Sequence, residues 1–221
     1  MKKLLMAAAV AMLVIPAQGQ VGIAVRAGTL GPGVELAYSF SPKLNLRATG
    51  SYLTYSHTED LDEEVSVSFD GEVTVGAVGA ILDFHPFSNW FRLSGGLTVN
   101  LFEVSGSGIP TEDYCFGDEV GGVCDGKVFT PQRMGSFGAT VSHPSSVAPY
   151  MGIGFGRVAG QSRIGFLFDI GTLYTGSPEI DLEAEGLLAP TADPEQEAEL
   201  NRGVESFQWY PVVSLGLAIR I

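Results

Sequence analysis

The sequence has no long apolar segment after its N-terminus, although its mean hydropathy is positive, at +0.23. A transmembrane helix needs about 20 consecutive apolar residues, and the longest run, residues 4–15, is shorter. Glycine, by contrast, is plentiful, with 29 residues spread along the chain. A chain that is apolar on average but has no apolar helix is typical of a transmembrane β-barrel, whose strands alternate lipid-facing apolar residues with small or polar lumen-facing ones.

Basic residues are also scarce. Lys and Arg number 12 against 25 Asp and Glu, which gives a formal charge of -13. Such an acidic chain has no electrostatic reason to bind nucleic acid. Three histidines and two cysteines form no metal-binding motif, and the sequence contains no phosphate-binding loop or cofactor motif. We therefore expect neither a cofactor nor a nucleic-acid partner.

The N-terminus has the layout of a secretory signal peptide. Lys2 and Lys3 precede the apolar run, and the small residues of "AQG" predict cleavage after Gly19. An uncleaved anchor helix would need a longer run. The predicted organisation is a signal peptide at 1–19 and one barrel domain at 20–221. Removal of the two lysines takes the charge from -13 to -15.

Period-2 alternation of apolar and small or polar residues recurs along the mature chain. In the first segment Val21, Ile23 and Val25 share one face. In the segment from 65 to 84 the apolar phase slips near residues 76–82, which predicts a bulge. The pattern predicts about eight antiparallel strands in an up-and-down barrel, at residues 21–30, 34–40, 44–56, 65–84, 91–102, 147–156, 164–174 and 209–221.

The connections alternate between terse turns and long acidic segments. "SPK", "HPFSNW" and "VAGQSR" are short, whereas residues 57–64, 104–145 and 179–206 are predicted as long loops. Short periplasmic turns and longer extracellular loops are the rule in outer-membrane barrels. The last loop should hold a short helix, with Asp193 as N-cap and Pro194 at its first position. Residues 179–184 are interpreted as a continuation of the strand before it.

The long segments hold 19 of the 25 acidic residues. A solvated, charged surface explains them. The sharper hypothesis is that they hold divalent cations near lipopolysaccharide, or bind a cationic partner.

One face of the predicted strands carries charges of both signs. A soluble lipocalin-like barrel would turn its apolar face inward, but the aromatic apolar face here would aggregate in water. The charged face is therefore assigned to the lumen. An eight-stranded barrel is only wide enough for its own side chains, so these charges predict a paired network that fills the lumen: Arg26, Glu35, Arg47, Asp83, Arg92 and Asp169.

The two cysteines, Cys115 and Cys124, lie in one predicted loop. Export places them in a compartment where disulfides form, so a local disulfide is expected. Two free thiols, an intermolecular link and, more weakly, a metal pair are the alternatives.

No catalytic residue is predicted. His85 lies two residues from Asp83 in "DFHPF", but at a predicted periplasmic turn. His57 and His143 have no nucleophile motif around them.

Several phrases carry a family resemblance: "VRAGTLGPGVELAYSFSPKLNLR", "LDFHPFSNWFRLSGGL", "FLFDIGTLYTGSP" and "WYPVVSLGLAIRI". The chain resembles small outer-membrane β-barrels of the OmpA, OmpX and opacity-protein type, and more closely a proteobacterial subgroup with the same order of phrases. The resemblance implies an outer-membrane location in a Gram-negative bacterium and a final strand recognised by the assembly machinery. That strand usually ends on an aromatic residue, whereas here Ile221 stands last. The residues implied in the signal are Val213, Leu215, Leu217, Ile219 and Ile221.

The expected function is that of a monomeric barrel in contact with outer-membrane lipid and lipopolysaccharide, with a structural, adhesive or surface-binding role. A narrow passive channel is the first alternative, and a lipid-modifying enzyme is the second.

Overall fold

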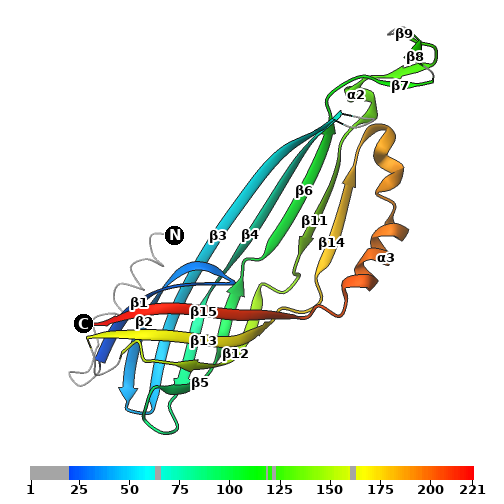
Figure 1. The fold of residues 1–221 in the computed structure, drawn as a ribbon. Helices are drawn as coiled ribbons and strands as arrows, with labels where there is room; N and C mark the ends of the chain where they lie inside the picture. The colour runs from blue at the N-terminus through cyan, green and yellow to red at the C-terminus, as the bar shows by residue number, and fades with distance from the viewer. Residues whose placement is uncertain (1–19, 63–65, 118, 121–122, 160–162) are drawn as a thin grey trace, which may run out of the picture.

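In the computed structural model eight antiparallel strands close into a barrel, which confirms the predicted fold class (Figure 1). The described residues are 20–62, 66–117, 119–120, 123–159 and 163–221, so the predicted signal peptide lies outside them. Each barrel strand pairs with its neighbour along the chain, and β15 closes the barrel against β1. The barrel strands are β1 (Gln20–Gly28), β2 (Gly31–Ser41), β3 (Leu44–Asp62), β4 (Ser66–Phe84), β5 (Phe91–Asn100), β12 (Val147–Phe155), β13 (Ile164–Tyr174) and β15 (Trp209–Arg220).

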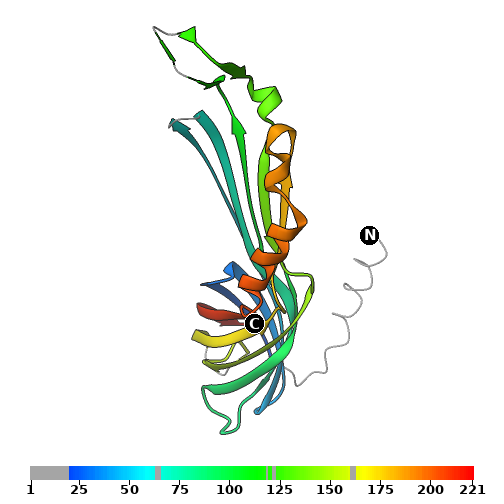
Figure 2. The ribbon, with the colours of Figure 1, turned by 90° about the vertical axis from the view of Figure 1, so that its right-hand side faces the viewer.

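Two of these strands are much longer than the barrel. β3 and β4 have 19 residues each, against ten in β5. β4 pairs with β5 along residues 77–84 and with β6 (Glu103–Pro110) along residues 67–74. β6 then pairs with β11 (Phe137–Ser142), and β11 with β14 (Glu179–Ala184). The sheet therefore continues beyond the barrel as a five-stranded extension, at the end opposite the C-terminus (Figures 1 and 2).

The predicted long loops are thus largely strands. Residues 57–62 belong to β3, and residues 104–145 contain β6, β11 and the short helix α2 (Pro131–Met134). Residues 179–184 form the separate strand β14 instead of continuing β13. Sequence favoured loops because Gly, Ser and acidic residues have low strand propensity, and only the pairing onto β4 makes these segments strands.

The predicted bulge in β4 is wrong. β3 and β4 pair without a register shift from Leu44↔Phe84 to Asp62↔Ser66. What changes is the environment. Within the barrel, Val78 and Leu82 point outward and Ile81 points into the lumen. Beyond the barrel, Val73 lies on the same face of the strand as Ile81, and Glu72 lies on the same face as Val78. The apolar face thus switches sides where the strands leave the barrel.

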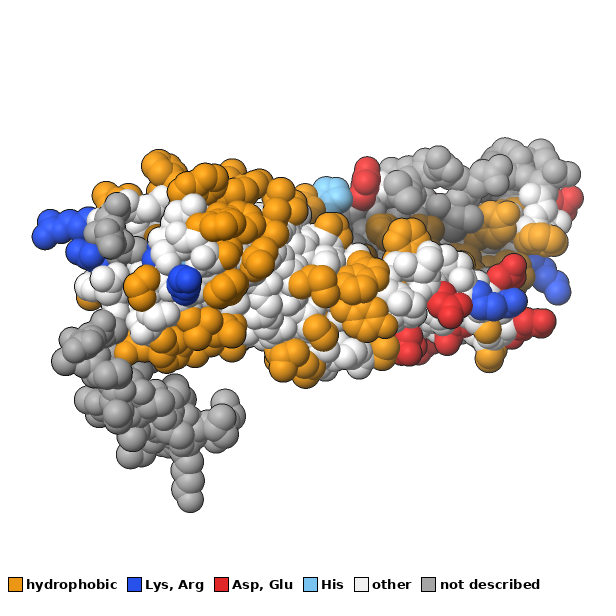
Figure 3. All heavy atoms as spheres, turned by 90° about the horizontal axis from the view of Figure 1, so that it is seen from below, with side chains coloured by type: hydrophobic (Ala, Val, Ile, Leu, Met, Phe, Trp, Pro, Cys, Tyr) orange, Lys and Arg blue, Asp and Glu red, His pale blue; other side chains and the backbone are white. Residues whose placement is uncertain are grey.

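The barrel exterior carries an apolar band (Figure 3). Aromatic pairs lie toward both of its ends. Tyr174 packs on Trp209 at the end nearer the extension, with ring centroids 4.9 Å apart. Trp90 packs on Phe155 at the opposite end, at 5.0 Å. Two aromatic girdles around an aliphatic belt are typical of a membrane-spanning barrel. Among the described residues, no helix is both long and apolar enough to cross a membrane.

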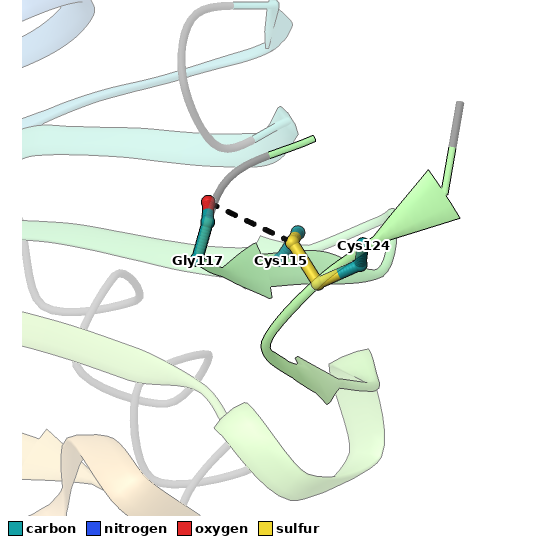
Figure 4. The surroundings of a disulfide bond; sticks show 3 residues. All are labelled: Cys115, Gly117 and Cys124. Atoms are coloured by element: carbon teal, nitrogen blue, oxygen red, sulfur yellow. Dashed lines mark hydrogen bonds between the residues drawn. A yellow bond between two sulfur atoms is a disulfide. The ribbon is translucent and has the colours of Figure 1, made fainter. Parts of the chain in front are cut away.

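The far tip is a small hairpin closed by a disulfide between Cys115 and Cys124, as the sequence predicted (Figure 4). The two Cα atoms are 5.7 Å apart. β7 (Tyr114–Phe116) pairs with β10 (Lys127–Phe129), and β8 (Glu119–Val120) with β9 (Val123–Cys124). The disulfide ties the two sides of the tip together.

The edge strand β14 is covered by helix α3 (Pro194–Val204), which follows the 3₁₀ helix η1 (Gly186–Thr191). Asp193 is the N-cap of α3, as predicted, because its carboxylate accepts a hydrogen bond from the Glu195 amide at 3.0 Å. From α3, the Asn201 side chain accepts from the Ile180 amide at 2.7 Å and donates to the Ile180 carbonyl at 3.1 Å. Asn201 thereby satisfies backbone groups at a sheet edge that would otherwise be open to pairing.

Candidate functional site: a lumen charge network and a distal groove

Six charged side chains meet inside the barrel, each from a different strand. Three are cationic and three anionic, and they come from β1, β2, β3, β4, β5 and β13: Arg26, Glu35, Arg47, Asp83, Arg92 and Asp169. Five of them are fully buried, and Arg26 is nearly so. Equal numbers of opposite charges leave the buried cluster neutral, which is the condition for holding ions in a dry interior.

Arg47 lies at the centre of this network. Its guanidinium lies 2.8 Å from the Glu35 carboxylate and 2.7 Å from that of Asp83. Asp169 accepts two hydrogen bonds from Arg92, at 2.7 and 2.8 Å, and pairs with Arg26. The contacts link strands across the lumen and are not limited to neighbouring strand pairs.

Sequence reasoning missed two supporting groups. The Ser94 hydroxyl donates to Asp83 at 2.7 Å. Gly154 on β12 leaves room for the Arg92–Asp169 pair, because a Cβ atom there would lie 2.4 Å from the Asp169 carboxylate and 2.7 Å from Arg92 Nε. The sequence did contain a signal for this role, because Gly154 is a lumen-facing glycine next to charged lumen residues.

The lumen is packed on both sides of the network. On the side of the chain termini, Val158 and Ala159 of the β12–β13 turn tuck into the barrel against Ala24, Leu167 and other small residues. On the other side, an apolar cluster crosses the lumen: Ala77, Ile81, Ala148, Tyr150, Leu173 and Val212. The turn had been predicted only as a turn, since nothing in "VAGQSR" indicates that it folds inward.

His85 lies in the turn after β4, outside the membrane-spanning part of the strand. Its backbone amide donates to the Lys43 carbonyl at 2.8 Å, and its imidazole is completely buried. Neither ring nitrogen has a hydrogen-bond partner among the described residues. Burial, and then the nearby positive charge of Arg157, lower the pKa of His85 from 6.5 to about 4. His85 is a neutral structural group here.

We expect this histidine to make the barrel less stable in acid. In the unfolded chain His85 takes up a proton as pH falls below 6.5, but the folded protein resists protonation until about pH 4. The free energy of unfolding should therefore fall between these values, by at most about 1.4 kcal/mol per pH unit for one proton. Urea unfolding from pH 7.5 to 4.5 measures the slope, and His85→Gln should flatten it. An equal slope in both proteins would contradict this role.

A second candidate site lies on the apolar face of the extension, here called the distal groove. It has a cavity volume of about 560 Å³. Strand register arranges its lining in three rows. The row nearest the barrel is largely aliphatic and consists of Tyr55, Val73, Val104 and Val141. The middle row holds the small residues Gly71, Gly106 and Ala139, and the outer row holds the aromatic residues Phe69 and Phe137.

The remaining predicted residues are placed as follows. Val213, Leu215, Leu217, Ile219 and Ile221 all face outward from the barrel and are exposed. His57 lines the distal groove, His143 packs against Phe102 with ring centroids 5.3 Å apart, and His85 lies in the turn after β4. In the part of the chain that the structure describes, no group of three or more His, Cys, Asp or Glu side chains is arranged to hold a metal ion.

Comparisons with known proteins support the assignment of the fold. No protein-family model matches the chain, and no curated protein matches it either. Among solved structures, the chain is similar to CarO2 of Acinetobacter baumannii, with a TM-score of 0.57 and 18% identity over 91% of this chain and 98% of that one. CarO from the same organism gives a TM-score of 0.55 and 18% identity, covering 90% and 97%. The fold is that of a small outer-membrane β-barrel. In this barrel, the charge network lies within the membrane-spanning part and the distal groove beyond it.

Proposed function

We propose that the chain is an outer-membrane protein of a Gram-negative bacterium, exported by way of residues 1–19, whose closed barrel anchors a surface-binding extension. The observation that carries the proposal is the contrast between the two parts. The lumen is packed with paired charges and apolar side chains, while the sheet continues past the barrel and exposes a groove. A closed barrel suits anchorage better than transport.

The asymmetry of the barrel supports an orientation with both termini in the periplasm. Three short turns and the last strand residue lie at one end, and the extension lies at the other. Acidic side chains gather at the extension, where some basic ones also lie, and at the opposite end the charged side chains in view are basic (Figure 3). Short turns belong on the periplasmic side and long connections outside. The extension would then stand among lipopolysaccharide headgroups.

The C-terminal strand supports insertion as a single closed unit. β15 pairs with both β13 and β1, and the Ile221 amide donates to the Val21 carbonyl at 3.0 Å. No edge is then left open to lipid within the barrel. We propose that the outward row that ends at Ile221 is the segment read by the assembly machinery, and that the protein works as a monomer.

A passive channel would conduct ions across planar bilayers, whereas the proposed anchor would not. Because the network and the inward turn fill the lumen, the purified protein should give no steady, reproducible conductance steps. A porin reconstituted in the same bilayers serves as the positive control. Retarded or advanced gel migration of the unboiled protein verifies that the barrel is folded. Reproducible conductance steps from the folded protein would contradict the anchor role and support a channel.

A further inference from the structure

The distal groove has the composition of a small-molecule site. Its volume of about 560 Å³ lies within the range of about 300–1,000 Å³ that is common for such sites. Gly71, Gly106 and Ala139 form a narrow floor between a row of larger aliphatic residues and a row of aromatic ones. The ring of Phe69 lies over Gly71 and Gly106, so the groove is bounded by this ring on one side and by the aliphatic row on the other. A narrow groove of this kind fits a thin, extended apolar chain.

Aromatic faces line the groove on two sides. Tyr55 is 64% exposed, although it belongs to the apolar face. Phe69 and Phe137 lie over β6, since a Cβ atom at Gly106 would be 3.0 Å from the Phe69 ring and one at Gly108 would be 2.3 Å from the Phe137 ring. Open aromatic faces attract ammonium groups through their quadrupole.

The charges around the groove favour a cation as well. Its charged lining residues are Glu72 and Glu183, and no described Lys or Arg lines it. These glutamates alternate with the apolar residues, so their carboxylates stand on the reverse face of a single-layer sheet. His57 also lines the groove. Glu59 lies beside His57 and pairs with Phe69 across β3 and β4, so it is the acid on the groove face. A carboxylate or phosphate ligand would be repelled.

We therefore propose that the distal groove binds amphiphiles with one alkyl chain and an ammonium head. The alkyl chain lies between the aliphatic row and the ring of Phe69, and the ammonium head lies against the aromatic rings. This inference deepens the surface-binding role proposed above and rests on it. The thin apolar chain of the ligand matches the narrow shape of the groove, and its positive head matches the acidic residues around the groove.

The test is photo-crosslinking in neutral maltoside micelles with dodecyltrimethylammonium that carries a diazirine on its chain. Dodecanoate with the same diazirine is the anionic probe. Mass spectrometry locates the label. We expect it on β4, β6 and β11, with the ammonium probe exceeding the carboxylate probe by about threefold to tenfold. Equal labelling by both probes would overturn the charge selection.

Two matched variants separate the groove from general adsorption. Ala139→Trp fills the floor and should abolish the label on these strands. Thr140→Trp places the same side chain on the opposite face of β11 and should leave the label unchanged. The double variant Glu72→Gln/Glu183→Gln should bring the two probes closer to equal labelling. Undiminished labelling of Ala139→Trp, or no label on these strands in the unaltered protein, would overturn the groove as a binding site.

The gel shift and bilayer conductance keep this test distinct from the proposed function. A folded, non-conducting barrel without a groove label would overturn the ligand proposal alone. A conducting barrel would overturn the anchor role, whatever the label shows.

Discussion

Asp169→Ala should lower the free energy of unfolding by about 3–5 kcal/mol, as expected when one partner of a buried ion pair is removed. Asp169 accepts two hydrogen bonds from Arg92, pairs with Arg26 and lies 3.9 Å from Arg47. Without it, three guanidinium groups share two carboxylates in a closed lumen. Urea unfolding in micelles, followed by the gel shift of unboiled samples, measures the loss.

Ser214→Ala is the matched control for this prediction. Ser214 pairs with Asp169 across β13 and β15, is almost fully buried, and its hydroxyl has no hydrogen-bond partner among the described residues. Its replacement removes a buried hydroxyl that makes no hydrogen bond, so stability should stay the same or rise slightly. The double variant Asp169→Ala/Arg92→Leu should lose less than the two single losses added together, because the groups share one network. An Asp169→Ala protein as stable as Ser214→Ala would refute the network as a stabilising unit.

The second large effect concerns the outer face of the strands. Leu97→Arg should destabilise the inserted protein by about 2–4 kcal/mol, the range for arginine on the lipid face near the bilayer midplane. Leu97 is 59% exposed in the apolar band and pairs with Ala80, midway along the part of β4 that belongs to the barrel. Refolding into phosphatidylcholine vesicles and urea titration measure the change.

Ser56→Arg provides the comparison on the extension. Ser56 is exposed on the same outward phase and pairs with Glu72 across β3 and β4. An arginine there stands in water opposite a carboxylate, so we expect a change within about 0.5 kcal/mol. Equal losses in the two variants would mean that the membrane boundary does not fall between these positions.

Strand alternation explains how much of this molecule is predictable from sequence. A charged residue such as Arg47 or Asp169 can be assigned to the lumen from strand alternation alone, because a charged side chain on the lipid-facing side would cost too much free energy. Which carboxylate it pairs with depends on strand tilt and on space left by residues such as Gly154. These are properties of the closed barrel, and no local pattern contains them.

The extension shows where the same reasoning fails. Val73 and Phe69 are apolar in the inward phase, which sequence reads as a slip relative to Val78 and Leu82. The pairing is continuous, and it is the solvent that changes from lipid to water. Likewise, Ser105 and Gly106 have little strand propensity, and they become part of a strand only because β4 offers a long free edge.

Accessibility along the outward phase of β4 tests the central claim most directly. Single cysteines at 68, 70, 72, 78, 80 and 82 would each carry a fluorophore in vesicles that contain brominated lipid, while Cys115 and Cys124 are protected by their disulfide. The account predicts strong quenching at 78, 80 and 82 and little quenching at 68, 70 and 72. Quenching that continues unbroken through position 70 would contradict a strand that leaves the membrane and exchanges its apolar face.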